Sequence, residues 1–130
     1  MTLFNKLPNP FQEGDKNRII GVVEPITLRR GDNTDEEDIL AAVNCGSDLS
    51  QIDKKFAQEL GLYSSELVVD RVPAAIDGRE KLVDQIEVVF TLEGEEKTSR
   101  WLVTDRTDEK QMIVLGKNDL RGFLVKIPEE

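Results

Sequence analysis

Apolar residues along the chain follow a pattern that is typical of β-strands. Runs rich in Val, Ile and aromatic residues predict strands at Arg18–Leu28 with a break at Pro25, Ile39–Val43, Glu66–Val72, Lys81–Leu92, Lys97–Thr104 and Met112–Leu115. Asp77-Gly78 and Glu93-Gly94 lie between consecutive strands and are turn dipeptides typical of β-hairpins. The pattern therefore predicts a mainly β domain.

One segment has the period of a helix instead. Ser50–Gly61 begins with a residue that can cap a helix, with Asp53 three positions on, and Gly61 is placed to end it. Its apolar face is formed by Ile52, Phe56 and Leu60. A helical turn is also predicted at Asn118–Arg121. This order of elements predicts a small closed β-barrel-like domain with one or two short helices.

The chain has 130 residues, which suits one domain with one core. Residues 1–17 contain Pro8, Pro10 and Gly14 and little periodicity, so they predict an extended N-terminal arm, and residues 18–130 form the domain. Two interpretations of the arm stay open. It is either a frayed terminus or a segment that packs on a partner through Phe4, Leu7 and Phe11.

Composition narrows the chemistry. The chain has no histidine, which excludes Ser-His-Asp and Cys-His catalysis and an ordinary zinc site. Its single cysteine, Cys45, excludes an intrachain disulfide and fits a reducing compartment. The net charge of −9 disfavours nucleic acid. There is no long apolar run and no secretory signal, so we expect a cytoplasmic protein with no membrane partner and no cofactor.

Two segments together indicate a site. Ala42–Ser50 (AVNCGSDLS) follows an apolar strand, and Met112–Leu120 (MIVLGKNDL) is a second apolar strand that ends in glycine and a polar turn. In this order they resemble the active-site loop and the later signature of the retropepsin-like aspartic peptidases. The resemblance is closest to the small proteins labelled "ATP-dependent zinc protease" that accompany ATP-grasp glutamate ligases. It is carried further by Ile20–Glu24 and Trp101–Arg106, and it covers residues 18–127.

This resemblance implies an acid-protease (retropepsin) fold that is active as a homodimer on a peptide or protein substrate. In such a site two aspartates, one from each subunit, share one proton and activate a water. Asn44 stands at the position of the catalytic aspartate, and Gly46 and Ser47 stand at the usual glycine and small residue. The family association also suggests a glutamate-extended tail as a substrate.

Other positions carry over as substrate-binding or supporting residues. Asp48 matches a position that contacts the substrate backbone, and the hairpin residues Ala75, Ile76, Asp77 and Gly78 lie where the family has its flap, a mobile cover over the substrate. The residues expected to support the loop are Cys45, Ser50, Gly116, Lys117 and Asn118. Lys117 replaces the usual arginine and is expected to pair with Asp48.

Asn44 departs from the family pattern, because an amide cannot act as a general base. Two explanations stay open. Asp→Asn is the smallest change that silences the site and keeps its shape, so an engineered variant is favoured by the otherwise intact loop. The alternative is a natural non-catalytic protein that uses the fold for binding or assembly. A third interpretation is an unrelated β-domain. Trp101 is expected as a large aromatic of the core or of an interface. Asp105, Asp108 and Asp119 are expected at the surface or as caps, with a catalytic or metal-binding role as the lesser alternative.

Overall fold

The structure is a computed structural model that describes residues 18–31, 35–76 and 78–125. The predicted N-terminal arm lies outside these residues. The elements are β1 (Arg18–Ile20), β2 (Val23–Arg29), β3 (Glu36–Val43), β4 (Gln51–Asp53), α1 (Lys54–Glu59), η1 (Ser65–Leu67), β5 (Val68–Ile76), β6 (Arg79–Leu92), β7 (Glu95–Thr104), β8 (Ile113–Leu115), η2 (Lys117–Asp119) and β9 (Phe123–Val125).

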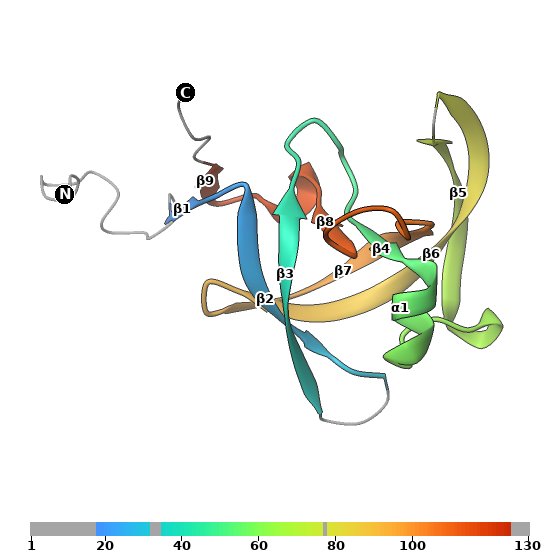
Figure 1. The fold of residues 1–130 in the computed structure, drawn as a ribbon, viewed down its shortest axis with the longest axis horizontal. Coiled ribbons are helices and arrows are strands. Elements are labelled where there is room, and N and C mark those ends of the chain that lie inside the picture. Colours follow the sequence, from blue (N-terminus) through green and yellow to red (C-terminus); the bar gives the residue numbers. More distant parts are fainter. Residues whose placement is uncertain (1–17, 32–34, 77, 126–130) are drawn as a thin grey trace, which may run out of the picture.

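Six strands close into a barrel. Their order is β2-β3-β8-β4-β7-β6, and the ring closes because β2 also pairs with the end of β6. β6 is long enough to pair with β5 through its first half and with β7 through its second half (Figure 1). β1 and β9 pair separately as two parallel strands. The prediction of a mainly β closed barrel with a short helix is confirmed.

The core lies inside this barrel. Alternate residues of β6 point inward, since Ile86, Val88, Phe90 and Leu92 are fully or almost fully buried. The ring of Phe90 lies 5.1 Å from that of Trp101, centroid to centroid, and the two rings are tilted by 54°. Trp101 is 0 % exposed, so its predicted place in the core is confirmed. Among the described residues no helix is long and apolar enough to cross a membrane.

The predicted start of the helix was wrong. α1 begins at Lys54, and the three residues before it form β4, which lies between β7 and β8. The N-cap is Asp53, whose Oδ2 accepts a hydrogen bond from the N–H of Phe56 at 3.0 Å. Ser50 precedes β4 and its hydroxyl bonds elsewhere. Gly61, at φ +75°, follows the helix as predicted.

The predicted break in the first strand lies earlier than Pro25. Residues 21 and 22 separate β1 from β2, and Pro25 lies within β2, paired with Leu40 of β3. On the other side of β2 the pairing with β6 starts only at Ile26. A proline has no N–H to donate, so it is tolerated where one neighbouring strand is absent.

The β5–β6 hairpin extends beyond the barrel wall and is fastened at its base. Tyr63 Oη donates to Asp84 Oδ2 at 2.6 Å, and Arg71 Nε donates to Asp84 Oδ1 at 3.0 Å. Arg71 belongs to β5 and Asp84 to β6, whereas Tyr63 follows α1. The hydrogen bond to the Asp84 carboxylate raises the pKa of Tyr63, because the phenolate could not donate it.

This contact is tested with the chain's only tyrosine. The pKa of Tyr63 should lie above the ordinary value of about 10, and Asp84→Asn should lower it toward that value. The associated stability is present below about pH 10 and is lost as the pH rises through the raised pKa. An ultraviolet absorbance titration measures the pKa. Tyr63→Phe should lower the free energy of unfolding by about 1 kcal/mol in urea titrations. An ordinary Tyr63 pKa would contradict the contact.

Candidate functional site

The loop between β3 and β4, residues 44–50, is called the Asn44 loop here. It meets the second motif, Met112–Leu120, at one end of the barrel. β3 and β8 are parallel neighbours, with Ala42 opposite Val114 and Val43 opposite Leu115. Parallel strands end at the same edge of a sheet, so the residues that follow each strand lie together. The N–H of Asn44 donates to the carbonyl of Leu115 at 3.0 Å. Two segments far apart in the sequence are thereby joined at Asn44.

The side chain of Asn44 is built into its own turn. Its Oδ1 accepts a hydrogen bond from the N–H of Gly46 at 2.9 Å, and its carbonyl accepts from the N–H of Ser47 at 3.2 Å. Asn44 and Cys45 are both exposed, and Cys45 is a free thiol. The amide of Asn44 therefore lies at the surface with a fixed oxygen.

Residues 116–118 cross close beneath the loop. The N–H of Lys117 donates to the carbonyl of Ser47 at 2.6 Å, and that of Asn118 donates to the carbonyl of Asp48 at 3.0 Å. A Cβ atom at Gly116 would lie 2.5 Å from the carbonyl carbon of Leu49. Only glycine allows the two backbones to approach this closely. The contacts between the loop and residues 116–118 are thus made by the backbone.

The Lys117 side chain lies next to that of Asp48. Its Nζ is 3.4 Å from Asp48 Oδ1, and the two side chains are 65 % and 76 % exposed. An ion pair this exposed contributes little stability. Asp48 is accordingly held mainly by its backbone, and its carboxylate faces solvent.

Asp119 is the functional candidate whose surroundings the sequence did not predict. It was expected at the surface or as a cap, but it is only 5 % exposed. Its Oδ2 accepts hydrogen bonds from Ser50 Oγ at 2.5 Å and from Trp101 Nε1 at 3.0 Å. Ser50 Oγ in turn accepts from the N–H of Gly116 at 2.9 Å. The one sequence signal was Trp101, since a buried indole N–H needs an acceptor.

The residues expected to form the flap lie at the end of the β5–β6 hairpin. Ala75 is exposed near the end of β5, Ile76 is its last residue, and Gly78 turns the chain at φ +76°. Asp77 lies outside the described residues. In the view of Figure 1 the hairpin end and the loop between β3 and β4 project toward the same side of the barrel. No hydrogen bond within the described part of the chain connects the hairpin end to Asn44.

A groove of about 560 Å³ runs between this hairpin and the segment after β7. Its polar lining consists of Lys54, Tyr63, Arg71, Lys81, Asp84, Thr104, Asp105, Thr107, Asp108 and Glu109. The Thr107 hydroxyl donates to Asp105 and lowers the pKa of that carboxyl. Asp105 and Asp108 are exposed, as predicted. Within the described ranges no group of three His, Cys, Asp or Glu side chains could hold a metal ion.

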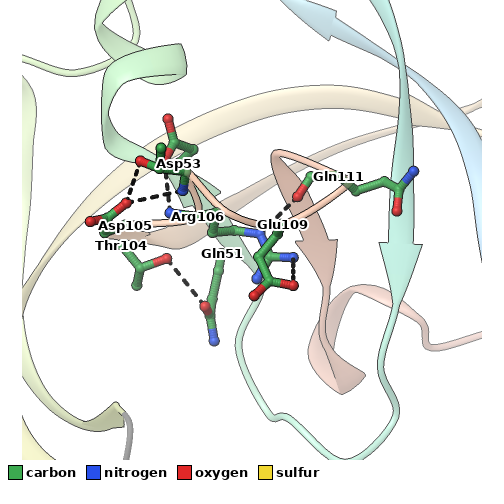
Figure 2. Close-up of polar contacts among 8 residues, drawn as sticks. Gln51, Asp53, Thr104, Asp105, Arg106, Glu109 and Gln111 are labelled. Carbon is green, nitrogen blue, oxygen red and sulfur yellow. Dashed lines mark hydrogen bonds and ion pairs between the residues drawn. The ribbon is translucent and has the colours of Figure 1, made fainter.

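The groove wall after β7 is fastened to the β4–α1 junction (Figure 2). The N–H of Arg106 donates to Asp53 Oδ1 at 2.8 Å, and Arg106 Nε donates to the carbonyl of Gln111 at 2.9 Å. Thr104 Oγ1 donates to Gln51 Oε1 at 3.2 Å. Buried Asp53 therefore accepts one hydrogen bond from the start of α1, at Phe56, and one from the loop after β7, at Arg106. A helix-capping pattern in the sequence predicts only the first of these.

Comparison with solved structures identifies this architecture. A retroviral protease-like domain of Ddi1 from Leishmania major superposes with a TM-score of 0.52 and 19 % identity, over 76 % of this chain and 74 % of that one. EIAV protease in complex with the inhibitor HBY-793 gives 0.53 and 15 %, over 75 % and 83 %. The fold is retropepsin-like. A Legionella pneumophila protein of unknown function, Lpg0085 (DUF785), gives 0.53 and 14 %, over 85 % and 94 %.

At these identities the comparison establishes the retropepsin-like fold and no more. No family model and no curated protein matches the chain. The narrower resemblance to the "ATP-dependent zinc protease" proteins is therefore not confirmed.

The crossing is tested with Gly116→Ala. Its Cβ would clash with the backbone of Leu49, so the free energy of unfolding should fall by about 1–3 kcal/mol in chemical denaturation. Gly21→Ala is the matched control, because its Cβ would meet nothing closer than 3.6 Å. Equal, small effects of the two substitutions would show that the crossing has room for a side chain.

Proposed function

We propose that this chain is the subunit of a homodimeric aspartic peptidase whose catalytic position is occupied by Asn44. The observation that carries the proposal is the exposed Asn44 turn, which follows β3 and is hydrogen-bonded to the end of β8 in a retropepsin-like fold. Two copies related by a two-fold axis would bring two such turns together. With aspartates there, the pair would share one proton and activate a water against a peptide bond.

In this proposal Gly46 and Ser47 shape the catalytic turn, and Asp48 is available to the substrate backbone. Asp48 is exposed and its carbonyl accepts a hydrogen bond from the N–H of Asn118, so its backbone is held in place while its carboxylate faces solvent. Ala75, Ile76, Asp77 and Gly78 would cover the bound peptide. With Asn44 the chain should have negligible peptidase activity, because an amide holds no titratable proton.

A second function is supported by the way Asn44 fits its turn. Its Oδ1 is satisfied by the N–H of Gly46, so the loop keeps its shape without an acid. A natural protein with Asn44 would then use the same exposed loop and hairpin to bind a peptide without cleaving it. The codon at position 44 in the native gene distinguishes this function from an engineered, silenced peptidase.

The groove between the hairpin and the segment after β7 has a mixed charge, and none of the residues that line it belongs to the Asn44 loop or to the hairpin end. Its lining has three basic side chains, Lys54, Arg71 and Lys81, and four acidic ones, Asp84, Asp105, Asp108 and Glu109. This lining offers no surplus of positive charge, and the whole chain carries −9. We therefore propose an ordinary peptide segment as the first substrate to test, and a glutamate-extended tail as the second, which would need a basic surface elsewhere.

The central test is Asn44→Asp. It should yield cleavage of an unfolded protein such as casein, measured as released peptides. A statine-type transition-state mimic should inhibit this cleavage. Gln58→Glu is the matched control, because it makes the same amide-to-acid change at an exposed position of α1. The proposal fails if Asn44→Asp, shown by light scattering to be dimeric, cleaves neither casein nor glutamate-tailed proteins.

The pH profile of Asn44→Asp gives a separate prediction. A pair that shares one proton is active only between its two macroscopic pKa values. Activity should therefore fall as the pH rises and the shared proton is lost, and fall again in strong acid when both carboxyls are protonated. A kcat/KM profile measured from acid to neutral pH checks this. A rate that is independent of pH across that range would point to another mechanism.

A further inference from the structure

A chain of hydrogen bonds with a fixed direction runs beneath the Asn44 loop. Ser50 Oγ accepts from the N–H of Gly116, so its own hydrogen is free to point to Asp119 Oδ2. The same oxygen accepts from Trp101 Nε1, which can only donate and whose single hydrogen is shared with Ser99 Oγ at 2.9 Å. Ser50, Trp101 and Asp119 are 1 %, 0 % and 5 % exposed. The arrangement therefore needs an acceptor oxygen at position 119.

The acceptor is a buried carboxylate without a cation. In the part of the chain that the structure describes, no lysine or arginine forms an ion pair with Asp119. Burial of a carboxylate is costly, and hydrogen bonds to a charged acceptor are about twice as strong as neutral ones. The two donors must therefore stay in place for Asp119 to remain buried. Trp101 belongs to β7, so Asp119 links β7 to Ser50 and, through the Ser50 hydroxyl, to the N–H of Gly116.

We infer that Asp119 is a positioning residue for the Asn44 loop, acting through the hydroxyl of Ser50 and the N–H of Gly116. The inference rests on the proposed function, because the loop that Asp119 positions is the one proposed to carry the catalytic pair. Ser50 ends that loop, and its carbonyl also accepts from the N–H of Leu102 at 2.9 Å. Gly116 begins the segment whose N–H groups bind Ser47 and Asp48. Asp119 thus holds the two crossing backbones in register.

The first test uses the chain as it stands and needs no activity. Asp119→Leu removes both acceptor oxygens at similar volume, so the amides of Gly116, Lys117 and Asn118 should exchange hydrogen about tenfold faster or more, by NMR, than global unfolding explains. Val88→Ala is the control, since it weakens the buried core on β6, a strand that pairs with β2, β5 and β7 and not with the crossing segments. Equal protection of these amides in the two variants, at matched global stability, would overturn the inference.

The second test uses kinetics in the Asn44→Asp background. Asp119→Leu should lower kcat about 10- to 100-fold, because the catalytic carboxylates would be misplaced. KM should stay within about a factor of two, since buried Asp119 offers the substrate no contact of its own. Val88→Ala should change neither. A fall in activity explained by unfolded protein alone, or a rise in KM at constant kcat, would contradict a positioning role.

Two further variants keep the inference testable if Asp119→Leu does not fold. Asp119→Asn can still accept both hydrogen bonds through its amide oxygen, so it should recover part of the amide protection and of kcat. Ser50→Ala should accelerate exchange at Gly116 as Asp119→Leu does. If Asn44→Asp shows no activity at all, the proposed function fails, and the exchange measurements still decide whether Asp119 positions the loop.

Discussion

The close approach of the backbone at Gly116 to the carbonyls of Ser47 and Leu49 is the constraint on which the site depends. It brings the N–H groups of Lys117 and Asn118 within hydrogen-bond distance of the Asn44 loop. No Cβ atom fits at Gly116, so the two backbones lie in direct contact there. The buried Ser50–Asp119 hydrogen bond then fixes how the segments are oriented.

Barrel and hairpin have different mechanical roles. The closed barrel places β3 and β8 side by side, and its packed interior leaves little freedom at their ends. The β5–β6 hairpin is attached to that barrel through one continuous strand and through the Tyr63–Asp84–Arg71 contacts. Its far end can therefore differ in position without disturbing the core. Under the proposed function, this less constrained hairpin would admit and then cover a peptide.

The shape of the Asn44 turn does not depend on whether position 44 carries an amide or an acid. An amide oxygen accepts the hydrogen bond of Gly46 as a carboxylate oxygen would, so the turn is compatible with either residue. Proton sharing between two subunits, in contrast, needs an acid. The same backbone can thus serve a peptidase or a binding protein, and one side-chain atom decides between them.

By itself the sequence determined the class of fold, most of the strands, the Gly61 and Gly94 turns and the pairing of the two motifs, because these follow from local periodicity, turn chemistry and short patterns. Only the tertiary structure decided the roles of Ser50, Asp53 and Asp119. Each is a short polar residue that local rules place at a cap or on the surface, yet each is buried. Their partners, Gly116, Arg106 and Trp101, come from strands and loops far along the chain. A hydrogen bond between distant segments leaves no local pattern, so it becomes visible only when the barrel closes.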